Sequence, residues 1–287
     1  MQLIPSLIRL MRPKQWSKNA LLLVAPFAAG QLFAFRELVI VAQSFVAFAL
    51  ISSACYIVND ICDIEIDRAN EKKRSRPLAS GEVSKNQALA LSISLVIIGF
   101  YVASYLPYNF QFLLLAYFII TNLYSFGLKN QPVIEFSIVA FGFTLRAIAG
   151  GFATDLPITK WFLVVTGFGS LVIVLSKRIA EGANTKNSST RKVIAEYPPN
   201  FLELILAIST AITLTSYSLW SFSINQIHPY AQISLIPVTM GIFRYLWLVS
   251  KGHGEAPEEL ILKDLYLIAC SFSTAALLFL AVYKSSH

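Results

Sequence analysis

Long runs of apolar residues recur along the chain, separated by short segments of proline, glycine and polar residues. Each run is long enough to cross a hydrocarbon core of about 30 Å as a helix of roughly 20 residues. The pattern predicts nine spans, at residues 19–35, 38–60, 86–106, 109–128, 133–153, 158–178, 200–222, 230–249 and 262–283. We therefore expect an all-α polytopic membrane protein. No low-complexity tract or long linker interrupts the pattern, so we treat residues 1–287 as one domain.

The composition supports a lipid environment. Of the 287 residues, 56% are hydrophobic and only 14% are charged, whereas soluble domains carry about 25% charged residues. So few charges cannot cover a water-facing surface, which argues against a soluble helical protein with an unusually apolar core. The three cysteines, Cys55, Cys62 and Cys270, lack the spacing of a metal site or a disulfide framework.

The positive charges gather on one side of the predicted membrane. Eighteen of the 23 lysines and arginines fall in the N-terminal segment and in alternate loops, and only three fall on the opposite side. Because positively charged loops stay in the cytoplasm, the net charge of +7 indicates membrane topology rather than a nucleic-acid partner. We predict a cytoplasmic N-terminus, and we expect residues 1–19 to lead into a retained helix rather than form a cleaved signal peptide.

Three aspartates lie at the cytoplasmic end of the second predicted span. Asp60, Asp63 and Asp67 are three and four residues apart, so a continuing helix would place them on one face. Carboxylates stacked in this way repel one another unless a cation lies among them. Mg²⁺ suits such hard oxygen ligands and completes its shell with water and substrate phosphates. We predict that the three are catalytic residues and metal ligands, because acids at a membrane-helix end are costly without a function.

A basic segment follows the aspartates and contains Lys72, Lys73, Arg74 and Arg76. Its cations can neutralise the oxygens of a diphosphate whose other oxygens bind the metal. Taken alone, the basic run would only mark a cytoplasmic loop. Acids and bases together predict a site for a metal-bound diphosphate.

The segment that holds these residues, 59–81, reads NDICDIEIDRANEKKRSRPLASG. It resembles the first signature of the UbiA-type prenyltransferase superfamily. The resemblance implies nine helices around a central cavity that opens to the bilayer, with the aspartates holding Mg²⁺ and the diphosphate of the donor. Asn59, Arg68 and Arg76, which belong to this segment, join the predicted substrate-binding residues.

A second acidic motif, DxxxD, follows the sixth helix in most members of that superfamily, and this sequence departs from it. Lys177, Arg178 and Glu181 stand there instead, followed by Glu196-Tyr197-Pro198. One carboxylate beside two cations favours an additional anionic group over a second metal. We expect Lys177, Arg178 and Glu181 to bind substrate, and the two cations to bind a phosphate of it.

Three further segments resemble one branch, the decaprenyl-phosphate phosphoribosyltransferases. RPKQWSKN at residues 12–19, YSFGLK at 124–129 and GFTLRAIAGG at 142–151 are similar to motifs of that branch. The resemblance covers residues 9–200 and implies transfer of 5-phosphoribose from phosphoribosyl diphosphate to a polyprenyl phosphate. It places this reaction at the cytoplasmic face of a bacterial membrane, in the supply of cell-wall precursors. Lys18, Tyr124 and Lys129 become candidate ligands of the diphosphate.

Arg146 lies well inside the fifth predicted span. An unpaired charge there costs at least about 2.5–3.5 kcal/mol, so an anionic substrate group is its expected partner. A structural ion pair with Glu135, Asp60 or Asp63 is the alternative.

Two other functions stay open on the sequence. A prenyltransferase that moves an isoprenoid from its diphosphate to an aromatic acceptor would share the first motif but ordinarily needs the second. A transporter or a non-catalytic lipid-binding protein would not need the aspartates, and no convincing internal repeat of the transporter kind is present. The sequence does not fix the length of the isoprenoid or whether the protein forms a homo-oligomer.

Overall fold

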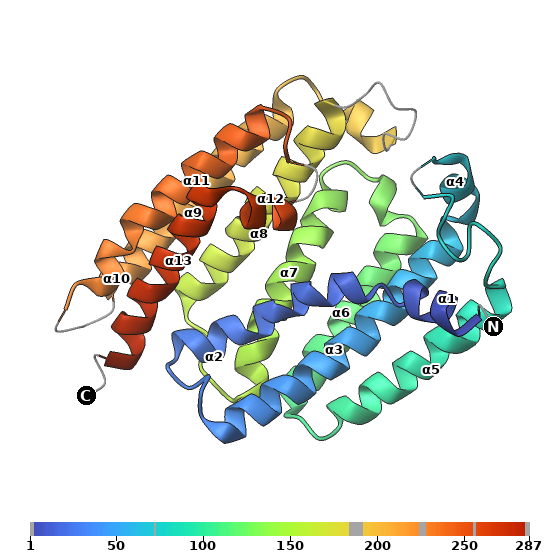
Figure 1. The fold of residues 1–287 in the computed structure, drawn as a ribbon, viewed down its shortest axis with the longest axis horizontal. Coiled ribbons are helices and arrows are strands. Elements are labelled where there is room, and N and C mark those ends of the chain that lie inside the picture. The colour runs from blue at the N-terminus through green and yellow to red at the C-terminus, as the bar shows by residue number, and fades with distance from the viewer. Residues whose placement is uncertain (1–2, 72, 184–191, 224–227, 255–256, 285–287) are drawn as a thin grey trace. The chain divides into compact units, whose positions relative to one another are not determined.

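The computed structural model describes residues 3–71, 73–183, 192–223, 228–254 and 257–284, and within these ranges its regular structure is entirely helical (Figure 1). Lys72, Lys186 and Arg191, which contribute to the predicted cytoplasmic charge, lie outside the described residues. Eight helices among the described residues are long and apolar enough to cross a membrane. The protein is therefore a multi-pass membrane protein.

Eight of the nine predicted spans match these helices within a few residues. They are Phe35–Cys62 (α3), Lys85–Ala103 (α5), Tyr108–Phe126 (α6), Ile134–Ala153 (α7), Lys160–Ala183 (α8), Phe201–Ser223 (α9), Tyr230–Ser250 (α10, Tyr230–Ile233, with α11, Leu235–Ser250) and Leu265–Tyr283 (α13, Leu265–Phe279, with part of the π-helical turn η4, Leu280–Lys284). The apolar runs thus predicted these elements correctly.

The first predicted span, residues 19–35, differs from the prediction. The chain begins with α1 (Leu3–Leu10), continues as the 3₁₀ segment η1 (Pro13–Leu23) and ends this stretch with the short α2 (Val24–Ala28). Gly30 then turns the chain at a φ of 72°. Runs of 3₁₀ helix longer than 3–4 residues are uncommon, so packing against other elements must hold η1 in place.

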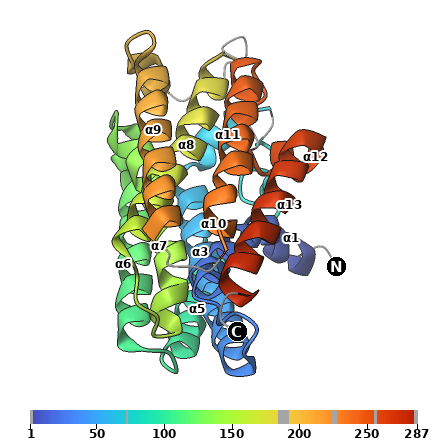
Figure 2. The same ribbon diagram turned by 90° about the vertical axis from the view of Figure 1, so that its left-hand side faces the viewer.

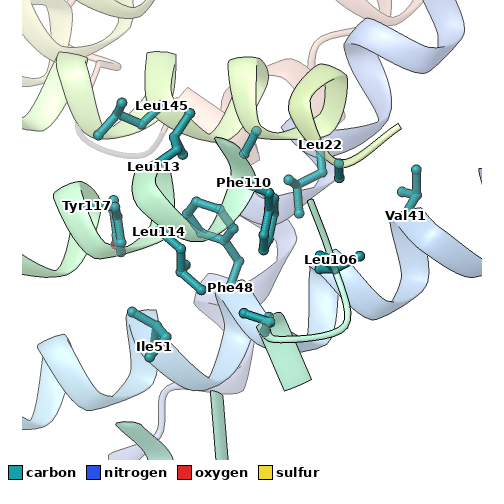
Figure 3. Close-up of a cluster of buried hydrophobic side chains, with 14 of the residues drawn as sticks. Leu22, Val41, Phe48, Ile51, Leu106, Phe110, Leu113, Leu114, Tyr117 and Leu145 are labelled. Atoms are coloured by element: carbon teal, nitrogen blue, oxygen red, sulfur yellow. The ribbon is translucent and has the colours of Figure 1, made fainter. Parts of the chain in front are cut away.

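The described helices form two compact units, and each is described here by itself. The first comprises Met1–Phe27, Gln31–Ile138 and Leu145–Pro157. Its largest apolar cluster surrounds Phe48 of α3, whose ring lies 5.9 Å from that of Phe110 and 5.2 Å from that of Tyr117 (Figure 3). Leu22 of η1 is fully buried in the same cluster. The core therefore joins η1 to the membrane-spanning helices.

A second cluster fixes the loop that follows the aspartates. Leu10 of α1, Leu78 and Val83 of the loop, and Ala88 of α5 pack together. Ser84 caps the N-terminus of α5, and its hydroxyl accepts a hydrogen bond from the backbone N–H of Gln87 in a capping box. Two contacts therefore fix the loop that carries Arg76. Its apolar side chains pack into the second cluster, and its last residues join the capped start of α5.

The second unit comprises Ala28–Gly30, Val139–Thr144 and Ile158–His287. In it α8 lies alongside α9, and α11 packs against α13 (Figure 2). The Tyr217 and Ser234 hydroxyls are 2.6 Å apart, and Arg244 forms an ion pair of 2.7 Å with Asp264 at the start of α13. Short helices η3 (Lys192–Glu196) and α12 (Pro257–Lys263) lie in its connections.

Candidate active site

The three aspartates follow one another along the end of α3 and the start of α4 (Ile64–Ala69). The backbone N–H of Asp63 donates to the carbonyl of Asn59 at 3.0 Å, and that of Asp67 donates to the carbonyl of Asp63 at 2.8 Å. This helix-like hydrogen bonding keeps the chain close to the predicted course. Asp60 and Asp67 are buried, with 3% and 2% of their surfaces exposed.

Cations from two parts of the chain neutralise the two buried aspartates. Nη1 of Arg76 lies 3.2 Å from Oδ1 of Asp60 and 2.6 Å from Oδ2 of Asp67, so one guanidinium bridges both carboxylates. Lys73 lies 3.9 Å from Asp67, and Arg12 of the N-terminal segment pairs with Asp60. The predicted grouping of aspartates with the basic segment is therefore present in the structure.

Asp63 has a different partner. The Lys129 ammonium, from η2 (Leu128–Asn130) at the end of α6, forms an ion pair with it. The side-chain amide of Asn59 donates to the same carboxylate at 3.2 Å. The structure thus brings together the predicted residues Asn59, Asp63 and Lys129, which come from two membrane-spanning helices and their ends.

Other predicted substrate-binding residues of the first unit lie differently. Arg68 donates to Glu65 at 3.0 Å and to the Ala79 carbonyl at 3.2 Å, contacts that hold α4 against its loop. Lys18 on η1 and Tyr124 near the end of α6 are partly buried. Binding of substrate by these three residues stays a prediction.

Arg146 is buried in α7 and has neutral polar partners that neither alternative predicted. Its Nε donates to Oδ1 of Asn19 at 2.9 Å, and its Nη2 donates to the Tyr117 hydroxyl at 2.7 Å. The guanidinium also lies 4.6 Å from the centre of the Tyr117 ring. These contacts favour a role in holding η1 against α6 and α7, and the predicted binding of a phosphate by Arg146 stays a prediction.

Arg12, Asn19 and Tyr117 are the residues that sequence reasoning missed. Arg12 and Asn19 stand at the two ends of the RPKQWSKN segment, whose similarity to a family motif was a signal for both. Arg12 was counted only among the topology charges. Nothing in the sequence marks Tyr117 as a partner of Arg146. The two residues are 29 positions apart, and a hydropathy pattern does not predict which side chains are in contact.

In the second unit, α8 carries Lys177, Arg178 and Glu181 within about one helical turn. Arg178 is buried and forms an ion pair of 2.8 Å with Glu181, while Lys177 is partly buried beside it. The structure therefore joins the predicted cation to the predicted carboxylate. That these residues share a site with the aspartates stays a prediction.

The arrangement of charge limits what the aspartate cluster can bind. Among the described residues, no three His, Cys, Asp or Glu side chains form a group that could hold a metal ion. Instead, carboxylates alternate with a lysine and arginines. Such a cluster suits a cation that arrives with a polyanion, because the metal can take the carboxylates while the side-chain cations take the anion.

Comparison with known proteins bears on the same residues. The model of the UbiA prenyltransferase family matches residues 20–268. The chain belongs to the UbiA prenyltransferase family. Two relatives of this UbiA-family chain are named decaprenyl-phosphate phosphoribosyltransferase. The one from Corynebacterium glutamicum is 37% identical over 98% of this chain and 88% of its own length. The one from Mycolicibacterium smegmatis is 36% identical over 91% and 87%.

Solved structures confirm the UbiA fold. A UbiA homologue from Archaeoglobus fulgidus bound to DMAPP and Mg²⁺ aligns with a TM-score of 0.73 at 18% identity, covering 97% of this chain and 99% of its own. A structure described as digeranylgeranylglyceryl phosphate synthase aligns with a TM-score of 0.72 at 17% identity, covering 99% and 100%. At these identities the likeness shows the fold alone. The predicted all-α fold is therefore confirmed, while membership of the family rests on the match of its model.

Proposed function

We propose that this UbiA-family protein transfers 5-phosphoribose from phosphoribosyl diphosphate to a decaprenyl-type polyprenyl phosphate and releases diphosphate. The observation that carries the proposal is the extent of its similarity to proteins named for that reaction, 37% identity over 98% of the chain. A similarity of that extent includes both the aspartate segment and α8. The lack of a second DxxxD motif in α8 supports this reaction over prenyl transfer to an aromatic acceptor.

The aspartate cluster suits the diphosphate of the donor together with Mg²⁺. Asp60 and Asp67 already share one cationic group, the Arg76 guanidinium, so their carboxylates are placed to share a cation. Hard carboxylate oxygens with few other protein ligands are what Mg²⁺ prefers, and the related A. fulgidus protein is described as bound to Mg²⁺. Asp60, Asp63 and Asp67 would hold the metal, and its chemistry there would be to neutralise negative charge on the departing diphosphate.

The side-chain cations of the cluster would bind the diphosphate oxygens that the metal leaves free. Arg76 and Lys129, which pair with the aspartates, are the first candidates. Lys18 and Tyr124 are the others. The aspartates already hold Arg76 and Lys129 in place before the reaction. These cations can therefore stabilise the leaving diphosphate without moving when the bond breaks.

The chemistry is a displacement at C1 of ribose. The bond from C1 to the diphosphate oxygen breaks, and its electron pair leaves with the diphosphate. An oxygen of the polyprenyl phosphate attacks C1 from the opposite side and forms the new bond, which inverts the configuration. The nucleophile is already an anion, so no general base is required. The protein therefore has to bind the donor diphosphate and the lipid phosphate on opposite sides of C1 and to stabilise the leaving diphosphate.

The α8 residues are proposed to bind the second anionic group. Lys177 and Arg178 supply two cations for the 5-phosphate of ribose or for the lipid phosphate, and Glu181 supplies a carboxylate for ribose hydroxyls. The ion pair between Arg178 and Glu181 supports this proposal, because it orients both side chains on one turn of α8. An Arg guanidinium suits phosphate through paired, planar N–H donors.

We place the reaction at the cytoplasmic face of a bacterial cell membrane, with the N-terminus in the cytoplasm. The bias of lysines and arginines toward alternate loops supports this orientation. The stretch from Arg12, which pairs with Asp60 at the end of α3, to the start of α3 at Phe35 runs along that helix and adds a ninth crossing, so the C-terminus lies outside. With a tag at each terminus, tested for protease access in sealed inside-out vesicles, the N-terminal tag should be cleaved and the C-terminal tag should be protected.

The decisive experiment uses purified protein in detergent, polyprenyl phosphate, Mg²⁺ and radiolabelled phosphoribosyl diphosphate. We expect label in the lipid phase with the wild type, and its loss with Asp63→Asn. Glu65→Gln is the matched control, because Glu65 lies two residues after Asp63 on α4 but is exposed and pairs with Arg68. It should retain activity.

Two results would argue against the proposal. Absence of labelled lipid, combined with prenylation of an aromatic acid when a prenyl diphosphate is supplied, would establish the prenyltransferase alternative. If Asp63→Asn and Glu65→Gln are equally active, Asp63 does not take part in the reaction, and the assignment of the active site to the aspartates is wrong. Omission of Mg²⁺ with EDTA present should abolish labelling by the wild type.

A further inference from the structure

Arg12 occupies an unusual backbone conformation at the entrance to η1. Its φ and ψ of 54° and 59° lie in the left-handed region, which residues other than glycine rarely adopt. Such strain persists only where surrounding contacts impose it, and it concentrates at functional sites. Here the conformation directs the side chain onto Asp60, with the guanidinium 5.4 Å from the centre of the Tyr56 ring.

A polar clamp on α3 imposes that conformation. The hydroxyl of Ser53, a fully buried residue, lies 2.9 Å from the carbonyl of Met11 and 2.7 Å from that of Ala49, and these two acceptors share its single proton. The same hydroxyl accepts a hydrogen bond from the indole N–H of Trp16 at 3.0 Å. The backbone just before Arg12 and the side chain four residues after it are therefore tied to one point on α3. The clamp fixes where Arg12 enters the aspartate cluster.

Asp60 thus carries two cations in the structure, Arg12 and the shared Arg76. Both arginines contact Oδ1 of Asp60, so a divalent metal at that oxygen displaces at least one of them, and a metal at Oδ2 is repelled by both. A guanidinium stays protonated at any physiological pH, so a displaced arginine needs another anion. The side chain of Arg12 is 24% exposed, whereas Asp60 is buried. Arg12 can therefore turn while its backbone stays clamped.

Building on the proposed function, we propose that Arg12 is a further substrate-binding residue of the site. It neutralises Asp60 until the metal arrives with the diphosphate, and it then donates to the diphosphate oxygens. Arg12 consequently opposes binding of the metal alone and favours binding of the metal with diphosphate. The metal and the diphosphate are thereby admitted to the site together.

This role makes two predictions of opposite sign for Arg12→Gln. Removal of the competing cation should tighten binding of Mn²⁺ alone by about fivefold to tenfold, the equivalent of one partly buried ion pair. Removal of the donor should weaken binding of Mn²⁺ with inorganic diphosphate by about tenfold or more. A residue that merely supports the fold would weaken both.

The test titrates Mn²⁺ into the full-length protein in detergent, with and without inorganic diphosphate, and follows free Mn²⁺ by electron paramagnetic resonance. Arg9→Gln is the matched control, because Arg9 lies on α1 and pairs with Glu82 outside the cluster. Its two affinities should equal those of the wild type. Arg12→Lys keeps the charge and should restore the wild-type affinity for Mn²⁺ alone, with thermal melting confirming that each variant is folded.

The outcomes separate this inference from the proposed function. If Arg12→Gln and Arg9→Gln match the wild type in both titrations, Arg12 has no such role, and the transfer reaction is unaffected by that result. If Arg12→Gln weakens both affinities equally while Arg12→Lys does not restore them, the residue acts through the fold and the inference is wrong. If the wild type binds Mn²⁺ and diphosphate with the expected coupling but labels no lipid, the proposed reaction fails and the assignment of Arg12 to a metal–diphosphate site stands.

Discussion

Gly150 is the residue of α7 on which η1 packs, and an added methyl group tests that contact directly. A Cβ at Gly150 would lie 1.9 Å from the carbonyl oxygen of Leu22, whereas ordinary van der Waals contact begins at 3.4 Å. The two segments would have to separate by about 1.5 Å, the difference between these distances. Backbone cannot swing aside as a flexible side chain can, so η1 itself must move.

The same displacement reaches the buried arginine. Asn19 lies three residues before Leu22 on η1, and Arg146 lies four residues before Gly150 on α7, so the two contacts are neighbours. A shift of that size breaks the 2.9 Å hydrogen bond between Asn19 and Arg146. Overpacking of about 1–3 kcal/mol and loss of a charged hydrogen bond of about 1.5–3 kcal/mol together destabilise Gly150→Ala by about 3 kcal/mol or more.

Thermal melting in detergent checks this prediction, with Gly167→Ala as the matched control. Gly167 also lies inside a membrane-spanning helix, but an added Cβ there meets nothing within 4 Å. Alanine should stabilise that helix by up to about 1 kcal/mol. We therefore expect Gly150→Ala to melt well below the wild type and Gly167→Ala at or above it. A Gly150→Ala protein that melts with the wild type would refute the packing of η1 on α7.

Three further changes test other parts of the structure. A Cβ at Gly254 would lie 2.8 Å from the Ser176 carbonyl oxygen, so Gly254→Ala should destabilise by about 1–3 kcal/mol in the same melting assay. Lys129→Met leaves its aspartate partner without a cation and should lower the transfer rate at least about tenfold; a rate above half that of the wild type would contradict the assigned role. Hydrogen bonds from Arg244 hold the pKa of Asp264 below its ordinary 3.8, so the ionised carboxylate stabilises the fold above that pH and less as the pH falls. Asp264→Asn should lower the melting temperature at neutral pH, and the difference should narrow below pH 3.8.

The membrane-spanning helices could be predicted because hydropathy acts locally. Each of the eight spans is an apolar run bounded by polar residues, proline or glycine, and lipid requires every such run to satisfy its own backbone hydrogen bonds. The 19–35 segment is as apolar as some of the others, yet it contains Pro26 and Gly30 and packs its Leu22 into the core of other helices. Hydropathy cannot distinguish a span from a segment buried against protein.

The candidate site was predictable only where charge spacing is local. Asp60, Asp63 and Asp67 fall within eight residues, so helical geometry alone suggested that they lie close together. The pairing of Asp60 with Arg12 spans 48 residues and depends on a left-handed backbone at an arginine. The partners of Arg146 were equally inaccessible, because a tyrosine and an asparagine in apolar surroundings give no charge pattern.

The contacts of η1 have a consequence for the order in which the protein is made. This segment leaves the ribosome before α3 and α7, yet it binds α3 through Trp16 and α7 through Asn19. The partner of Asn19 lies 127 residues later in the chain. This contact can form only after α3, α5, α6 and α7 have been made, so docking of the N-terminal segment completes the first unit late in biogenesis.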